Sequence, residues 1–297
     1  MKHYLKLYRV IKNVIKIWSI KIKAHKEHFI HDEEMLSSIN RNPRLIISIT
    51  SYGKRVYRSL PYTLYSLTYQ TLKPDMIVVW LDENKWNDMK LNKTLHRFKE
   101  KGVLFKYCED IRSYTKLIPA LLEYPNDVII TLDDDIFYQK RKIEQLYNSY
   151  VNNPQGVHYM EASKITLNAK NEIAPSIEWQ YISKVNSCSI PVPLGVYGVL
   201  YAPGALNNEV FKKDIFLSLA STTDDLWFFL MGIMNNNFYF YVGPDEAPDL
   251  YIDKIYQYFH SNSALFKKNC LNNANDICFN KLIDFYSCRQ RIIQKLK

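Results

Sequence analysis

The chain has 297 residues, of which 47% are hydrophobic and 23% are charged. This composition is typical of a globular protein with a sizeable core, and it excludes bulk disorder. Eight glycines and twelve prolines exclude collagen-like and low-complexity classes. The five cysteines show no CxxC spacing, and their odd number argues against a complete disulfide framework. We therefore expect reduced thiols in a cytoplasmic protein.

The formal net charge of +9 is concentrated at the N-terminus. Residues 1–28 carry eight lysines and arginines against one glutamate, so the rest of the chain is near neutral and we expect no nucleic-acid partner. Apolar residues recur here at helical spacing: Tyr8, Ile11, Val14, Ile15, Trp18 and Ile22. Lysine interrupts every apolar stretch, so we expect neither a transmembrane span nor a signal peptide.

A basic amphipathic helix suits an anionic membrane surface. We therefore expect residues 1–28 to bind such a surface, with the protein attached peripherally to the inner face of the cell membrane. Packing of this helix on its own domain or on a partner subunit is the alternative.

From residue 43 onward, short apolar strands alternate with helices. The expected strands are 44–50, 76–81, 103–108 and 126–132, and the expected helices are 59–72, 89–101, 115–123 and 143–151, the first of them capped by Ser59. After residue 154 the pattern loosens, with strands expected at 158–167 and 238–242 and a helix at 222–234. Strand–helix–strand units set successive strands parallel. The sequence thus predicts an α/β fold with an open, mainly parallel sheet flanked by helices over 43–260, between a basic segment at 1–38 and a helical extension at 261–297.

Acidic residues follow three of the predicted strands: Asp82, Asp110 and the run Asp133, Asp134 and Asp135. In open α/β sheets, ligands bind at the carboxyl ends of the strands. If the run is extended, Asp133 and Asp135 face one side and Asp134 the other. Two carboxylates on one side repel each other unless a cation lies between them.

Oxygen ligands of this kind suit Mn²⁺ or Mg²⁺, which typically bind one or two carboxylates together with substrate phosphates. Such a cation favours two reactions at a diphosphate, namely displacement of a sugar from a nucleoside diphosphate and transfer of a nucleotidyl group. Neither a Walker loop nor a GxGxxG turn follows the first strand, which argues against kinases and dehydrogenases.

Four segments resemble a bacterial GT-A-type glycosyltransferase with a DXD motif, of the kind used in capsule or lipopolysaccharide biosynthesis. They are RLIISITSYGKR, LPYTLYSLTYQTLKPDMIVVWLDE, DIRSYTKLIPAL and IITLDDDIFY, and the resemblance covers residues 43–260. It implies a nucleotide-sugar donor, with a UDP-sugar favoured, and a glycan or lipid-linked acceptor. It also implies that Asp133 and Asp135 are the DXD pair that holds the metal.

The same resemblance assigns residues to the donor pocket. It implies that Thr50, Ser51 and Tyr52 line the nucleotide site, that Asp82 and Asp110 lie near the base or ribose, and that Lys116 lies near the phosphates. Asp134 belongs to this donor-binding set instead of the metal pair. The glycine-containing stretch 193–199 resembles a segment that approaches the donor and acceptor sugars, since glycine permits close backbone approach.

Asp224 and Asp225 open the helix expected at 222–234. In inverting enzymes of this type, an acidic residue at such a helix start is the general base for the acceptor hydroxyl, and a carboxylate is chemically adequate for that role. We prefer Asp225 as the base and Asp224 as the helix cap. His260 is a candidate third metal ligand, although a lone histidine is more often structural.

The sequence therefore favours a metal-dependent, inverting glycosyltransferase. A sugar nucleotidyltransferase with a similar sheet is the first alternative, although its Gly-rich phosphate loop is poorly matched by SITSYGKR. The second alternative is a membrane-surface binding module with a degenerate site, which the intact aspartates argue against.

Overall fold

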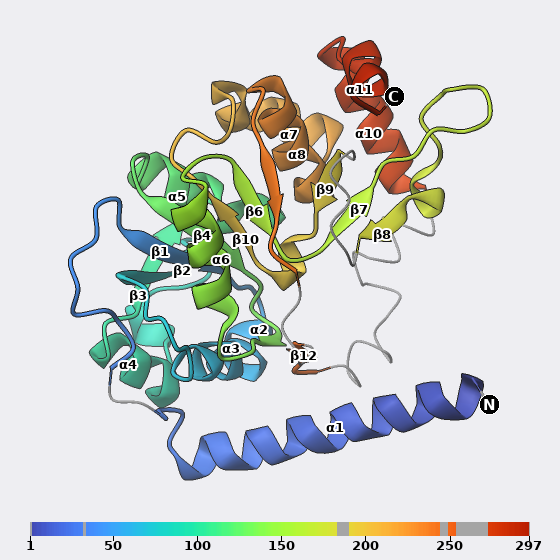
Figure 1. Cartoon of the computed structure of the whole chain (residues 1–297). Coiled ribbons are helices and arrows are strands. Elements are labelled where there is room, and N and C mark those ends of the chain that lie inside the picture. The colour runs from blue at the N-terminus through green and yellow to red at the C-terminus, as the bar shows by residue number, and fades with distance from the viewer. Residues whose placement is uncertain (1, 32–33, 183–189, 244–248, 254–272, 297) are drawn as a thin grey trace.

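The computed structural model describes residues 2–31, 34–182, 190–243, 249–253 and 273–296. A seven-stranded sheet forms its centre, in the order β11-β6-β10-β4-β1-β2-β3 (Figure 1). Its strands are β1 (Leu45–Thr50), β2 (Met76–Asp82), β3 (Leu104–Cys108), β4 (Val128–Leu132), β6 (Val157–Tyr159), β10 (Val199–Tyr201) and β11 (Tyr239–Tyr241). Helices flank the sheet, which confirms the predicted α/β class.

Most neighbouring strands of this sheet are parallel. β1 pairs in parallel with both β2 and β4, and β2 pairs in parallel with β3. β10 is antiparallel to β4 and to β6, which in turn lies parallel to β11. In the order β3-β2-β1-β4 the direction of winding reverses between β1 and β4. The carboxyl ends of these two strands therefore frame a topological switch point, the usual ligand position in open α/β sheets.

Of the first four expected strands, β1, β2 and β4 form because their apolar runs are buried on both faces, whereas the edge strand β3 is only partly buried. Every residue of β4 is buried, as are all of β1 except Thr50. The polar Ser48 in β1 is tolerated because its hydroxyl donates to the carbonyl of Lys116 (2.5 Å) and accepts from the Trp80 indole (2.9 Å). The strand runs read from the sequence are thus confirmed.

The helices from residue 55 onward are α2 (Arg55–Arg58), α3 (Leu60–Leu67), α4 (Lys93–Glu100), α5 (Ile118–Glu123), α6 (Lys142–Asn152), α7 (Lys213–Leu219), α8 (Asp224–Met234), α10 (Ala274–Phe285) and α11 (Arg289–Leu296). Most helices are shorter than the sequence indicates, although α6 extends one residue beyond the expected 143–151 at each end. The helix expected at 89–101 begins only at Lys93, because the Asn92 side chain caps it by accepting from the Leu95 amide (3.0 Å). Ser59 is not the expected side-chain cap, since its hydroxyl donates back to the carbonyl of Arg55.

Two small sheets complete the fold. β5 (Ile136–Phe137) pairs with β12 (Leu250–Tyr251), and β7 (Ala162–Lys164) lies between β8 (Gln180–Ile182) and β9 (Pro191–Pro193). Short 3₁₀ turns include η1 (Asp88–Lys90), η2 (Arg112–Lys116), η3 (Ser176–Glu178), η4 (Gly195–Tyr197) and η5 (Asn208–Phe211). The strands expected at 158–167 are β6 and β7, which belong to different sheets.

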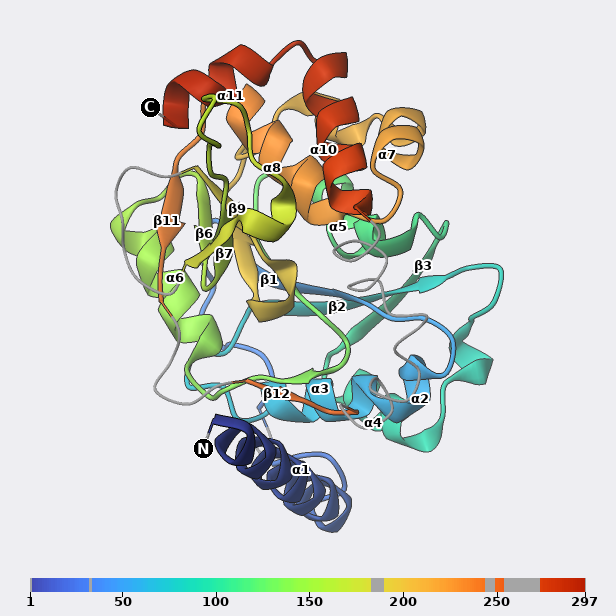
Figure 2. The ribbon, with the colours of Figure 1, turned by 90° about the vertical axis from the view of Figure 1, so that its right-hand side faces the viewer.

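The two terminal helical segments lie at opposite ends of the molecule (Figures 1 and 2). α1 (Lys2–Lys26) runs beside α3 and β12, whereas α10 packs on α7 and α8. Ile17 and Ala24 turn inward from α1, while Ile15 and Trp18 are exposed. The apolar face read from the sequence is therefore not the face that packs on the domain. No helix among the described residues is long and apolar enough to cross a membrane.

Candidate active site

The aspartate run lies in a turn between β4 and β5, at the switch point of the sheet. Arg55, the first residue of α2, binds two of the three carboxylates with its guanidinium. Its Nη1 lies 2.8 Å from Asp134 Oδ1, and its Nη2 lies 3.0 Å from Asp135 Oδ2. The predicted alternation, with Asp134 on the opposite side from Asp135, is therefore wrong, because a turn does not have the period of a strand.

The loop after β1 supplies two further contacts to this group. The Ser51 hydroxyl donates to Asp134 Oδ2 (2.5 Å), which ties the end of β1 to the turn after β4. The Tyr52 ring lies over the Arg55 guanidinium at 5.2 Å and is 57% exposed. Burial raises the pKa of Asp134, although Arg55 and Ser51 oppose this. Ser51, Tyr52 and Asp134 thus meet, as the sequence predicts for parts of one site.

Sequence reasoning missed Arg55. The signal that could have found it is the basic pair Lys54-Arg55, which follows the first strand at the edge where a ligand is expected. Burial alone would lower the pKa of Arg55, but Asp134 and Asp135 raise it above its ordinary value. A guanidinium suits this position because its fork can contact two carboxylates at once.

Lys116 forms a second centre at the end of η2. Its Nζ lies 3.2 Å from Asp133 Oδ1 and 3.1 Å from Asp224 Oδ2. The side chain is buried, and burial alone would lower its pKa, but Asp133, Asp224 and Asp225 raise the pKa well above the ordinary value. Lys116 therefore joins the turn after β4 to the start of α8, two regions that the sequence assigns to separate halves of the site.

The start of α8 presents Asp224 and Asp225 differently from the prediction. Thr223 is the N-cap residue and Asp224 is already helical, so Asp224 is not the cap. The carboxylate of Asp224 instead contacts Lys116, whereas Asp225 Oδ1 accepts from the Gly195 amide (3.2 Å). Negative charge at a helix start is favoured by the helix dipole, which accommodates both side chains.

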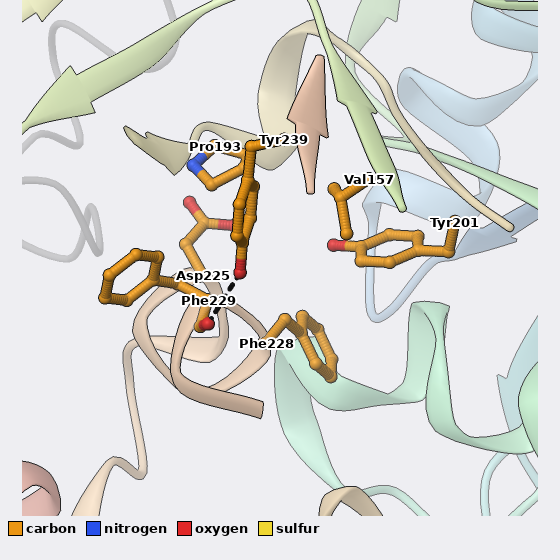
Figure 3. A pocket seen from close by; sticks show the side chains of 7 residues that line it. All are labelled: Val157, Pro193, Tyr201, Asp225, Phe228, Phe229 and Tyr239. Atoms are coloured by element: carbon orange, nitrogen blue, oxygen red, sulfur yellow. Dashed lines mark hydrogen bonds between the residues drawn. The ribbon is translucent and has the colours of Figure 1, made fainter. Parts of the chain in front are cut away.

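A small, closely packed pocket that is lined mainly by aromatic side chains backs Asp225 (Figure 3). Its lining residues are Val157, Pro193, Tyr201, Asp225, Phe228, Phe229 and Tyr239. Burial in these surroundings and the neighbouring Asp224 raise the pKa of Asp225 to about 7, against the opposing effect of Lys116. A carboxyl group with such a pKa exchanges protons near neutrality, as a general base requires.

Gly195 lies against both groups of this second centre. A Cβ placed on it would lie 2.7 Å from Lys116 Nζ and 2.9 Å from Asp225 Oδ1. Only glycine therefore lets the backbone at η4 donate to Asp225 without displacing Lys116. The stretch 193–199, expected near the reacting sugars, does reach the aspartates. Asp133 is fixed from the same side, because Tyr138 accepts from its amide (2.8 Å) and donates to the carbonyl of Val196 (3.1 Å).

Of the remaining predicted residues, the described ones are Thr50, Asp82 and Asp110, and they have other partners than these two centres. The Thr50 hydroxyl donates to the carbonyl of Trp80 (3.2 Å). Asp82 pairs with Lys85 (2.8 Å), which is the main reason that its pKa is lowered, and Asp110 lies 4.0 Å from the same lysine. Asp82 and Asp110 thus form a third group at the ends of β2 and β3. His260 lies outside the described residues.

The donor set fits a divalent cation that is shared with a substrate. At the two centres, five carboxylates face the two cations Arg55 and Lys116. This excess of negative charge opposes the approach of a diphosphate unless further positive charge is supplied. Within the described part of the chain, no group of three or more His, Cys, Asp or Glu could hold a metal ion by itself. A cation here would therefore need donor phosphates and water as additional ligands, a mode typical of Mg²⁺.

No protein-family model and no curated protein sequence matches the chain. Among solved structures, it is similar to CMP:2-keto-3-deoxy-manno-octonic acid synthetase complexed with CTP (13% identity, 74% of this chain and 98% of that one, TM-score 0.41). It is also similar to 4-diphosphocytidyl-2C-methyl-D-erythritol synthase (12% identity, 75% and 98% of the chains, TM-score 0.45). A third similar structure is S. aureus TarS (15% identity, 76% and 39% of the chains, TM-score 0.47). At these identities and TM-scores, the likenesses do not say which reaction this chain performs.

Proposed function

We propose that this protein is a glycosyltransferase that moves a sugar from a nucleotide-sugar donor, preferably a UDP-sugar, to a glycan or lipid-linked acceptor. The observation that carries the proposal is the Lys116 centre. There, Lys116 pairs with Asp133 from the switch point and acts electrostatically on Asp225, whose pKa of about 7 suits a general base. Sugar transfer needs these two functions side by side, one at the leaving diphosphate and one at the acceptor hydroxyl.

On the donor side, Asp133 and Asp135 are the residues that would hold Mn²⁺ or Mg²⁺. When bound, this cation would neutralise the charge that develops on the diphosphate leaving group. Asp133 is the more accessible of the two, with 29% of its side chain exposed. Lys116 contributes a second positive charge near the phosphates, and Ser51 with Arg55 fixes the turn that carries both aspartates.

On the acceptor side, Asp225 removes the proton from the attacking hydroxyl. The hydroxyl oxygen forms a bond to the anomeric carbon while the bond from that carbon to the diphosphate oxygen breaks. The nucleoside diphosphate leaves with the electron pair of the broken bond, and the proton stays on Asp225. Attack from the face opposite the leaving group inverts the anomeric configuration, so we expect an inverted product. The Gly195 amide orients the carboxylate for this step.

A donor screen tests this proposal. The purified chain is incubated with UDP-, GDP- and CMP-sugars in the presence of Mn²⁺, and the release of free nucleotide is measured. We expect hydrolysis of one donor class, its loss on addition of a chelator, and its loss in the Asp133→Asn variant with folding intact. Full turnover of that variant with chelator present would overturn the metal role. The anomeric configuration of a transferred sugar, measured by NMR, tests inversion separately.

The same assay addresses the alternatives. A sugar nucleotidyltransferase would consume a nucleoside triphosphate and release pyrophosphate, so a parallel incubation with CTP or UTP and sugars separates the two activities. A degenerate binding module would release nothing from any donor. A role in capsule or lipopolysaccharide synthesis and attachment to the inner membrane face are further parts of our proposal.

A further inference from the structure

The outer side of α1 carries an apolar stripe that packs on nothing in the described chain. Its described members are Ile15, Trp18 and Ile22, which are 64%, 62% and 54% exposed. Their spacing of three and four residues aligns them along one line of the helix. Single exposed apolar residues are normal in soluble proteins, but three aligned on one helix form a surface.

A row of lysines runs beside this stripe. Lys12, Lys16 and Lys26 are all exposed, and their spacing of four and ten residues places them on the same side of the helix. No acidic residue occurs within α1. The outer face is therefore apolar on one side and uniformly cationic on the other.

The opposite face of α1 fixes its orientation on the domain. Ile17 and Ala24 are buried against the domain, and Lys21 forms an ion pair with Asp253 (2.7 Å). His25 and Tyr62 make a hydrogen bond (3.2 Å) near the end of the helix. Figure 1 shows α1 as a straight rod along one end of the molecule. Because the inner face is anchored, the apolar stripe and the lysines keep their outward direction.

We infer that this outer face of α1 docks on an anionic lipid surface. Tryptophan and isoleucine enter the boundary between headgroups and acyl chains, while lysine stems reach the anionic headgroups. A second copy of this chain is a poor occupant, because an isologous contact would set the lysine rows against each other. The inference rests on the membrane attachment named in our proposed function and gives it a surface, but it does not depend on the reaction that the site performs.

Docking in this way orients the candidate active site. Asp253, which holds Lys21, directly follows Ile252, whose amide donates to the carbonyl of Asp135 (2.9 Å). The membrane would therefore lie on the α3 and β12 side of the sheet, next to the turn that carries the aspartates. A lipid-linked acceptor would meet the site from that side.

Vesicle flotation of the full chain tests the inference. We expect binding to phosphatidylcholine vesicles that contain phosphatidylglycerol, little binding without it, and weaker binding at high salt. Replacing Lys12, Lys16 and Lys26 together by glutamine should weaken binding by about a hundredfold, since each lysine contributes about a factor of five. Trp18→Glu should weaken binding by at least about tenfold.

The control is Met89→Glu, which makes the same charge change at an apolar residue that is 90% exposed in η1. It should bind vesicles like the parent chain. Donor hydrolysis should be unchanged in Trp18→Glu, so failure of membrane docking and failure of the proposed reaction are distinguishable. Equal binding to neutral vesicles, no binding to either kind, or a dimer that Trp18→Glu dissociates would each overturn the inference.

Discussion

Arg55 and Lys116 each bind two aspartates of the site, but the two cations have different surroundings. Arg55 is partly exposed and contacts Asp134 and Asp135, which are neighbours in sequence. Lys116 is buried and draws together Asp133 and Asp224 from distant parts of the chain. A third carboxyl group, that of Asp225, also acts on Lys116 electrostatically.

The difference separates a mainly structural centre, whose Asp135 would also hold the metal, from a reactive centre that carries the candidate base. A guanidinium on two carboxylates with good geometry satisfies its partners and holds the turn. A single ammonium among three carboxylates cannot neutralise them all, and the pKa of Asp225 rises to about 7 as a result of burial and of Asp224. Perturbed groups of this kind concentrate at functional sites. Each prediction below concerns a substitution that disrupts one of the two centres.

The largest effect is expected for Asp225→Asn. The variant cannot accept the acceptor proton, so transfer should slow by about 10²–10⁴-fold, the usual contribution of a general base. For the parent chain, the rate should fall as the pH drops below about 7, because Asp225 is then protonated. Initial rates across pH for both proteins measure this. A variant that retains the parent rate and pH profile would show that Asp225 is not the base.

Lys116→Met should have the next largest effect, on stability. Removing the only cation among three carboxylates leaves buried charge uncompensated, and such losses cost about 3–5 kcal/mol. Urea unfolding at neutral pH measures the change. Lys142→Met is the matched control, because Lys142 is equally buried but pairs with Asp249 (2.8 Å) away from the site. Both variants should lose stability, but only Lys116→Met should shift the pH profile of donor turnover.

A smaller effect on stability is expected for Asp225→Asn. The folded state raises the pKa of Asp225 to about 7 from an ordinary value near 4, so ionised Asp225 destabilises the fold. This cost is absent below about pH 4, grows as the pH rises, and is complete above about pH 7. The variant should therefore be on the order of 2–4 kcal/mol more stable than the parent at alkaline pH and equal to it at acidic pH. Equal stabilities at both pH values would contradict the raised pKa.

Much of this fold can be predicted from the sequence, because buried parallel strands appear there as continuous apolar runs. The runs that become β1, β2, β3 and β4 could be read with nearly correct ends. Helix ends could not, because they depend on local partners such as the Asn92 cap of α4. The second half of the chain was harder still to predict, since its strands have two or three residues and belong to different sheets.

The candidate site, like the fold, could be predicted from the sequence only in part. The aspartate run was found because it follows an apolar strand at the edge where ligands bind. The cations that hold it were not paired from the sequence, since Arg55 and Asp134 are 79 positions apart and no local period records such a contact. The geometry of the turn between β4 and β5 could not be predicted from the sequence either. A strand period applied beyond Leu132, the last residue of β4, separated Asp134 from Asp135, which share one guanidinium.

Arg55→Lys should have the smallest effect. It tests whether the Arg55 centre acts independently of the Lys116 centre. Lysine keeps the charge but cannot contact Asp134 and Asp135 through a planar fork, so one of the two contacts is lost. We expect a loss of about 1 kcal/mol, the net value of a typical hydrogen bond, measured by urea unfolding. The pH profile of donor turnover should keep its midpoint, because Asp225 belongs to the other centre. A shifted midpoint would mean that the two cations act as one unit, and the division into a structural and a reactive centre would then be wrong.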